Sequence, residues 1–281
     1  MKKNQSVDLL HGPIFKSLSL LAIPIMATYF IQMAYNLVDM LWIGFLGSGA
    51  VASIGVSGNF MYLSNGLVNM PKIGSQALVG QSLGANNQEQ TKNYIQAAFQ
   101  SSLFFALIYG IIIIVFQKYL IQLFNLSDSA IIQDAQNYLW ITCGFIVFSF
   151  VNQIFTGILT AAGYSKSTFI ATTTGLVLNL ILDPVLIFVF NLRVIGAALA
   201  TILAQIIVTL VFLYNTKNLD LFRNIRILSK PKLNHISEIL KIGFPSSVQS
   251  MLFTCISMYI ARLISSFGAI SVAVQKVGSQ I

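Results

Sequence analysis

The chain has 281 residues, of which 56% are hydrophobic and only 9% are charged. A soluble domain usually carries about 25% charged residues to cover itself with a solvated surface, so this composition excludes a water-soluble globule. The net charge of +8 does not indicate nucleic-acid binding, because the basic residues concentrate in short loops between apolar segments. Cys143 and Cys255 lie inside apolar stretches and are expected to be small core residues, with no disulfide or metal site implied.

Apolar segments of about the length that a helix needs to cross a bilayer, roughly 20 residues, follow one another along the chain. They span residues 18–43, 51–68 (extendable to 83), 94–116, 137–161, 168–190, 196–214 and 239–267. Two connections, 44–49 and 191–193, are tight, which predicts that the helices they join are antiparallel neighbours. The sequence therefore predicts an all-α polytopic membrane protein.

Lysine and arginine are distributed asymmetrically between the loops. If the N-terminus lies in the cytoplasm, only Lys118 and Arg193 fall outside, which is the bias that the positive-inside rule expects. The longest and most basic connection, 215–238, is expected to separate two helical bundles. We therefore expect a multi-pass protein of the cell membrane, with a six-helix lobe at 1–214, a cytoplasmic linker at 215–238 and the start of a second lobe at 239–281.

The second lobe is expected to repeat the first. A shift of 221 residues places Pro24 over Pro245, Gly47 over Gly268 and Val51-Ala52 over Val272-Ala273 without a gap. Internal duplication of this kind is common in secondary transporters. On this interpretation the chain holds helix seven and the beginning of helix eight of a twelve-helix unit, and the rest of the C-terminal lobe is a missing partner.

Two acidic residues, Asp39 and Asp183, lie inside apolar helices. An aspartate at the centre of a transmembrane helix costs about 2.5–3.5 kcal/mol on insertion scales, so such residues usually face a bundle interior or a water-filled cavity. The alternative is a neutral aspartic acid that is hydrogen-bonded to the backbone, or one that reaches the membrane interface.

Polar neighbours favour the cavity. Gln32, Tyr35, Asn36 and Asp39 are spaced i, i+3, i+4 and i+7, which draws one polar stripe on an apolar helix. Asn179 and Asp183 share a face of another helix, directly before Pro184, whose missing N–H leaves a carbonyl one turn back without its helical partner. Asp39, Asp183 and Thr201 also lie at similar depths below the predicted outer loops. These patterns predict one polar pocket in the outer half of the first lobe.

Such a pocket admits two chemistries. Two carboxylates in a low-dielectric cleft repel each other, so one of them would hold a proton. Alternatively, the oxygens of Asp39, Asn179, Asp183 and Thr201 would coordinate a hard cation such as Na⁺. Either cation would neutralise the pocket and so bias an alternating-access equilibrium. No cofactor is expected beyond the coupling ion.

Other polar residues carry weaker indications. Asn152 and Gln153 are expected to face the interior of the same lobe. Lys72, beside Pro71, fits either a cavity or a broken helix end where its amine reaches the interface.

Several stretches resemble the multidrug and toxic compound extrusion (MATE) family, and the similarity covers essentially the whole chain. The matching stretches are Ala22-Ile-Pro24 through Asp39, Val79-Gly-Gln-Ser-Leu-Gly-Ala85, Ala161-Ala-Gly163, Asn179-Leu-Ile-Leu-Asp183-Pro184, Gly196-Ala-Ala-Leu-Ala-Thr201 and Lys241-Ile-Gly-Phe-Pro245. The resemblance implies two six-helix lobes and export of small organic cations in exchange for H⁺ or Na⁺.

The resemblance also implies roles for individual residues. Asp39, Asn179, Asp183 and Thr201 match the cation-site pattern of a DinF-like branch, and Gln32, Tyr35 and Asn152 match positions around that pocket. Members that carry a coupling acid on helix seven place it eight residues after the proline, where this chain has Phe253. This departure favours coupling through the first lobe. Family members have about twelve helices, whereas seven are predicted here.

Three alternatives stay open. A lipid-linked sugar flippase of related architecture would be expected to carry several basic residues in its cavity, whereas Asp39 and Asp183 make this one acidic. A membrane-embedded enzyme is disfavoured, because His11 and His235 lie at cytoplasmic edges and no phosphate-binding loop is present. The third is a truncated polypeptide that does not transport by itself.

Overall fold

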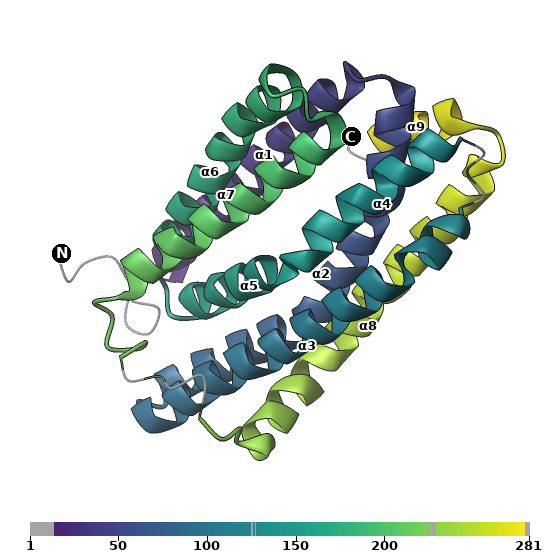
Figure 1. Ribbon diagram of the computed structural model, residues 1–281. Helices are drawn as coiled ribbons and strands as arrows, with labels where there is room; N and C mark the ends of the chain where they lie inside the picture. Colours follow the sequence, from purple (N-terminus) through teal and green to yellow (C-terminus); the bar gives the residue numbers. More distant parts are fainter. Residues whose placement is uncertain (1–13, 125, 127, 224, 226–228, 279–281) are drawn as a thin grey trace.

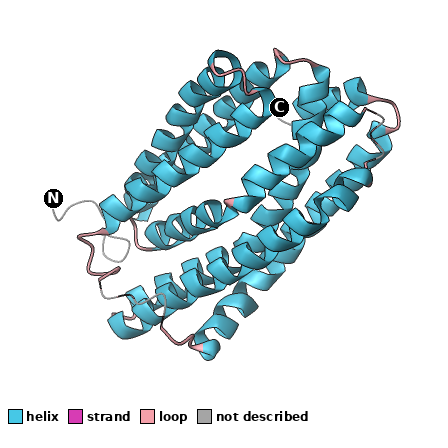
Figure 2. Cartoon of the chain, in the orientation of Figure 1, coloured by secondary structure: helices cyan, strands magenta, loops and turns pink. Residues whose placement is uncertain are grey.

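The computed structural model describes residues 14–278 apart from 125, 127, 224 and 226–228, and the described chain consists of helices and the loops between them (Figure 2). In chain order the elements are α1 (Ile14–Gly44), α2 (Ser48–Gly84), α3 (Gln88–Gln122), α4 (Ser129–Gly144), α5 (Ile146–Ala161), α6 (Ser165–Pro184), a π-helical turn (Val185–Val189), α7 (Arg193–Thr216), α8 (Leu233–Ser265) and α9 (Ala269–Gly278). The predicted all-α fold is confirmed.

Among the described helices, five are long and apolar enough to cross a membrane, and the bent pair α4–α5 would make a sixth span. The predicted segment 51–83 forms α2, a helix of 37 residues that does not reach the same hydropathy. Its serines, asparagines and glycines lower the average. Many residues of α2 are buried against neighbouring helices. Their side chains do not contact lipid, so they do not need to be strongly apolar.

The helices form three groups (Figure 1). α1, α6 and α7 pack together on one side, α2, α3 and α8 on the other, and α4–α5 runs between them. The turns 45–47, 190–192 and 266–268 lie at one end of the bundle, which we call the Gly47 end. The opposite end, with the turn around Gly163, is called the Gly163 end.

α1 leaves α2 after their tight connection. We expected both tight connections to join packed neighbours, and this is correct for α6 and α7. α1, however, packs mainly on α6 and only slightly on α2. This divergence matters for the site, because it opens a small cavity between α1, α2 and α4.

The hydropathy pattern predicted one straight helix over residues 137–161, and this prediction is wrong. α4 begins at Ser129 and ends at Gly144, and α5 leaves it at an angle of 51° after Phe145. Glycine weakens the helix at this point. α3 also approaches closely here, since a Cβ on Gly110 would lie 2.9 Å from the carbonyl oxygen of Cys143. The bend therefore has both a local cause and a packing cause.

α6 passes through Pro184 and then widens into the π-helical turn Val185–Val189. The amide of Phe190 donates to the carbonyl of Val185 at 3.0 Å, a bond that spans five residues instead of four. Proline supplies no N–H to the regular ladder, so the helix cannot continue undisturbed. Turns of this kind are often found at functional sites, and this one begins two residues after Asp183.

The duplicated sequence has a duplicated backbone. α1 ends at Gly44 and α2 begins at Ser48, and 221 residues later α8 ends at Ser265 and α9 begins at Ala269. Gly47 and Gly268 both have a positive φ, of 101° and 99°. We call α1–α2 and α8–α9 the first and second copy.

α8 lies along α2, and glycines allow the close approach. A Cβ on Gly74 of α2 would overlap the carbonyl of Ile239, and one on Gly243 of α8 would overlap the carbonyl of Met70. Small residues at helix crossings are typical of membrane bundles, where backbones meet closely. Ser247 adds a hydrogen bond of 2.8 Å to the carbonyl of Gly66.

Candidate functional site

Asp183 is fully buried at the end of α6. Its Oδ1 accepts a hydrogen bond of 3.2 Å from Nδ2 of Asn179, one turn earlier on the same face. When both acids are ionised, its Oδ2 has no N–H or O–H donor within the described part of the chain. A buried carboxyl oxygen without a donor is costly as an anion, so this atom is suited to a proton or a cation.

Asp39 of α1 is the acidic group that acts on Asp183. The two carboxyls interact electrostatically and, when one of them carries a proton, through a hydrogen bond. Asp39 is partly buried and lines a cavity of about 130 Å³, together with Asn36 of the same helix. The rest of this small cavity is formed by Met40, Ile54, Gly58, Met61, Tyr62 and Tyr138. Two acids from separate helices therefore meet beside a space that can hold several waters.

Tyr138 of α4 completes this cluster. Its side chain interacts electrostatically with Asp39 and Asp183, and it shares a hydrogen bond with the side chain of Thr201 of α7. Thr201 also donates to the carbonyl of Ala197 at 3.0 Å. We call the group Asp39, Tyr138, Asn179, Asp183 and Thr201 the acidic niche. Four helices contribute to it, namely α1, α4, α6 and α7.

The structure thus brings together the four residues predicted for the cation site and adds Tyr138, which sequence reasoning missed. A tyrosine near the end of an apolar segment is indistinguishable from one of an interfacial aromatic belt. The only signal was its depth, similar to that of Asp39. The niche offers carboxyl, amide and hydroxyl oxygens, the ligand types that hard cations prefer.

Asn152 lies in a different network. Its Nδ2 donates to the backbone oxygen and to Oε1 of Gln205 on α7, at 2.9 and 2.8 Å. Its Oδ1 accepts from Thr209 at 2.8 Å. Both the Nδ2 and the Oδ1 of the Asn152 amide are therefore hydrogen-bonded to α7. These bonds connect α5 to α7 and support the packing of the two helices.

The other predicted pocket residues are dispersed. Gln153 accepts a hydrogen bond of 2.7 Å from Nζ of Lys72, so the lysine of α2 points into the bundle toward α5. Gln32 is exposed and lines neither described cavity. The side chain of Tyr35 lies outside the described residues. Of the polar stripe on α1, Asn36 and Asp39 reach the small cavity.

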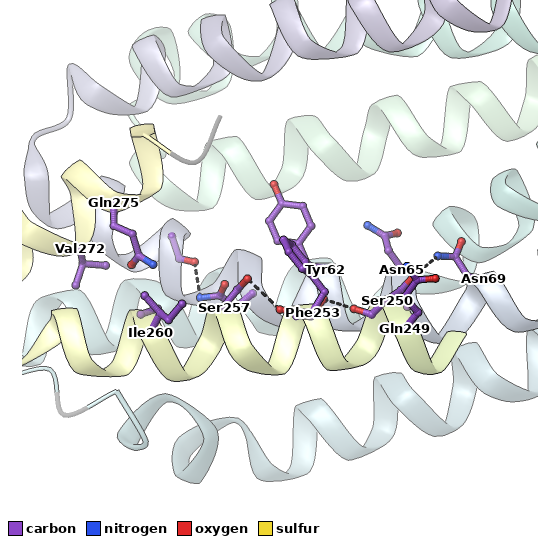
Figure 3. Close-up of a pocket in the computed structure, with 15 residues that line it drawn as sticks. Tyr62, Asn65, Asn69, Gln249, Ser250, Phe253, Ser257, Ile260, Val272 and Gln275 are labelled. Atoms are coloured by element: carbon purple, nitrogen blue, oxygen red, sulfur yellow. Dashed lines mark hydrogen bonds between the residues drawn. The ribbon is translucent and has the colours of Figure 1, made fainter. Parts of the chain in front are cut away.

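A larger cavity of about 700 Å³ lies between α2 and the second copy (Figure 3). Its described lining is uncharged and rich in amides and hydroxyls, with aromatic surface from Tyr62 and Phe253. The amides come from Asn59, Asn65, Asn69, Gln249 and Gln275. A space of this size fits a drug-sized molecule. Tyr62 lines both the large and the small cavity.

Comparison with known proteins gives consistent results. The sequence profile of the MatE family matches residues 24–185, which is more than half of the chain. "Multidrug export protein MepA" of Staphylococcus aureus (strain NCTC 8325 / PS 47) is 26% identical over 279 residues, and the protein of the same name from Staphylococcus saprophyticus is 26% identical over 288 residues. Each match covers 97% of this chain and 61% of the relative, so the chain spans less than two thirds of the relatives' length.

Solved structures show the same fold. An inward-facing multidrug resistance MATE family transporter of the MOP superfamily superposes with a TM-score of 0.82 at 23% identity, covering 94% of this chain and 60% of that one. An outward-facing one gives 0.83 at 22% identity, covering 100% and 66%. The two scores are nearly equal, so the similarity identifies the fold and not a conformational state.

Proposed function

Because this chain belongs to the MatE family, we propose that it forms the cation-coupled part of a multidrug exporter. The proposed activity is export of amphipathic organic cations in exchange for H⁺ or Na⁺ by alternating access. In this proposal the N-terminus and the basic linker 215–238 lie in the cytoplasm, the protein lies in the cell membrane, and a further helical lobe completes the unit. Members of the family are transporters, and no enzymatic step is proposed.

The observation that carries the proposal is the contact between Asp39 and Asp183, two acids from separate helices. In a low-dielectric site the two cannot both be charged without large repulsion. Binding a cation removes that repulsion. A conformation in which the niche is closed is therefore favoured when the cation is bound, and one in which water reaches the acids is favoured when it is absent.

The large cavity is the proposed substrate site. It is wide enough for a drug-sized molecule, and its amides and aromatic rings can bind both polar and apolar parts of a ligand. Aromatic faces also attract organic cations. The described lining of the two cavities contains no lysine or arginine, which favours a cationic cargo over the diphosphate of a lipid-linked sugar.

The direct test is infrared difference spectroscopy of the purified protein between acidic and alkaline pH, with and without Na⁺. A carboxylic-acid band that disappears in both Asp39→Asn and Asp183→Asn, while thermal unfolding stays cooperative, is the expected result. Loss of the band when Na⁺ is added at constant pH would assign Na⁺ as a competing ligand. A spectrum that both substitutions leave unchanged would contradict the proposal.

The transport arm uses ethidium efflux under an imposed H⁺ or Na⁺ gradient, from vesicles that carry the protein together with the lobe that completes the unit. Both asparagine variants are expected to abolish gradient-driven efflux. Glu89→Gln, at an exposed acid in the first turn of α3, is the matched control and should leave efflux unchanged.

A further inference from the structure

Tyr62 occupies the border between the two cavities. It lies on α2, where Asn59 and Gly66 face the large cavity and Gly58 and Met61 face the small one. Tyr62 belongs to both linings. In the close-up, its ring rises from α2 beside Phe253 and its hydroxyl points away from α8 (Figure 3). The ring therefore forms part of the wall of the large cavity, whereas the hydroxyl is directed away from the second copy.

A second observation connects this hydroxyl to the acids. Tyr138 lines the small cavity with Tyr62. Its side chain interacts electrostatically with Asp39, Asp183 and Tyr62. The two tyrosines thus share the small cavity that lies between the acidic niche and the wall of the large cavity. Tyr62 is the one of the two that has a surface in both spaces.

We propose that Tyr62 is a positioning residue that transmits the cation state of the acidic niche to the large cavity. This inference rests on the proposed function. A tyrosine hydroxyl can donate or accept a hydrogen bond, so its preferred partner depends on whether the nearby acids are charged or neutralised. A change of partner turns the ring, and the ring is part of the surface that the cargo would touch. The two sites then influence each other, because the free-energy difference between the two positions of this side chain depends on both of them.

The test is a double-mutant cycle at constant pH. A reporter cysteine replaces Ser257, which lines the large cavity. The exposed Cys255 is replaced by serine, and the buried Cys143 is kept. Asp183→Asn imitates the neutralised niche. The rate of maleimide labelling at the reporter is measured with and without Asp183→Asn, in the Tyr62 protein and in the Tyr62→Phe variant, which keeps the ring and removes the hydroxyl.

We expect Asp183→Asn to change the labelling rate about threefold or more when Tyr62 is present, a coupling of the size seen between residues of one network. In the Tyr62→Phe variant the same substitution should have less than about half of this effect on the logarithmic scale. The matched control is Tyr259→Phe on α8, an exposed tyrosine that lines neither cavity. In this background the full effect of Asp183→Asn should persist.

The inference is overturned if Asp183→Asn changes the labelling rate equally with and without the Tyr62 hydroxyl, or if it changes nothing in the Tyr62 protein. The infrared measurement separates this result from failure of the proposed function. A carboxylic-acid band that depends on Asp39 and Asp183, together with an unchanged labelling cycle, leaves the cation site standing and removes Tyr62 as its link. Absence of the band removes the cation site itself.

Discussion

The first and second copies have the same backbone and different chemistry. Both place a helix, a left-handed glycine and a second helix in the same register. Asn36 and Asp39 of the first copy correspond to Ser257 and Ile260 of the second. Each pair lines a cavity: the first pair lines the small one beside Asp183, and the second pair lines the large one.

This comparison separates what the fold requires from what the chemistry requires. The turn and the helix ends are retained in both copies, because they follow from backbone geometry. The ionisable group occurs only in the first copy, where α6 supplies a second acid across from it. Corresponding faces of the two copies thus line two different cavities. The small one is beside a pair of acids, and the described lining of the large one is uncharged, with amides, hydroxyls and apolar side chains.

The strongest way to break the difference is Asp39→Ile, which gives the first copy the residue of the second. Gradient-driven ethidium efflux should fall at least about tenfold, because one isolated acid lacks the repulsion that a cation relieves. Stability should be equal or higher, since a costly group is removed from the membrane. Ile260→Val is the control and should leave efflux within about twofold. Efflux that survives Asp39→Ile under both gradients would show that the acid pair is dispensable.

The reverse substitution, Ile260→Asp, places an acid in the large cavity. Affinity for a permanent organic cation such as tetraphenylphosphonium should rise about tenfold, the effect of one charge at close range in a partly hydrated site. Isothermal titration of the detergent-solubilised protein measures it. Ile260→Asn has nearly the same shape without the charge, so equal affinities of the two variants would mean that the cavity does not hold the cation near position 260.

The shared backbone predicts equal costs at the two turns. Gly47→Ala and Gly268→Ala should each lower the free energy of unfolding by about 1–3 kcal/mol, because alanine is disfavoured at positive φ. Gly44→Ala is the control, since a Cβ added there would meet no atom within 4 Å and its φ is not positive. Denaturant unfolding in detergent gives the three values. Destabilisation at one turn but not at the other would separate the two copies structurally.

The smallest expected effect is that of Asn36→Ser, which copies Ser257 into the first copy. A serine keeps a polar oxygen at the wall of the small cavity, so cation affinity should change by no more than about threefold. Titration of the carboxylic-acid infrared band measures the change, with Asn36→Leu as the apolar comparison. A tenfold loss with serine would place Asn36 in direct contact with the bound cation.

Sequence reasoning picked out those members of the acidic niche whose signal lies in neighbouring residues of the chain. Asp39 and Asp183 stood out because a charge in an apolar helix is costly, and Asn179 lay one turn from Asp183 on the same face. Thr201 was named from its predicted depth and from the family resemblance. Helical periodicity and hydropathy also located the helices, since both depend on residues close together in the chain.

Sequence reasoning does not reach the partners that decide the role of a residue. Asn152 faces the interior of the lobe as expected, but Gln205 and Thr209, which satisfy its amide, are distant in sequence. Tyr62 gave no signal and Tyr138 gave only its depth, because an aromatic ring within an apolar helix fits a core, a belt or a cavity wall equally well. The bend after Gly144 was missed because hydropathy averages do not register a break of one residue. The divergence of α1 from α2 depends on the packing of α6, which no short stretch of sequence encodes.

The π-helical turn after Pro184 has a consequence for the evolution of this chain. A hydrogen bond that spans five residues uses one amino acid more than the regular α-helical bond, so this stretch holds a residue that a straight helix would not need. Relatives with a regular helix here should align with a single-residue gap between positions 185 and 189. In such relatives the side chains beyond the gap would be rotated by about 100° relative to Asp183, so insertion or loss of this one residue would reorient the end of α6 without altering any side chain of the acidic niche.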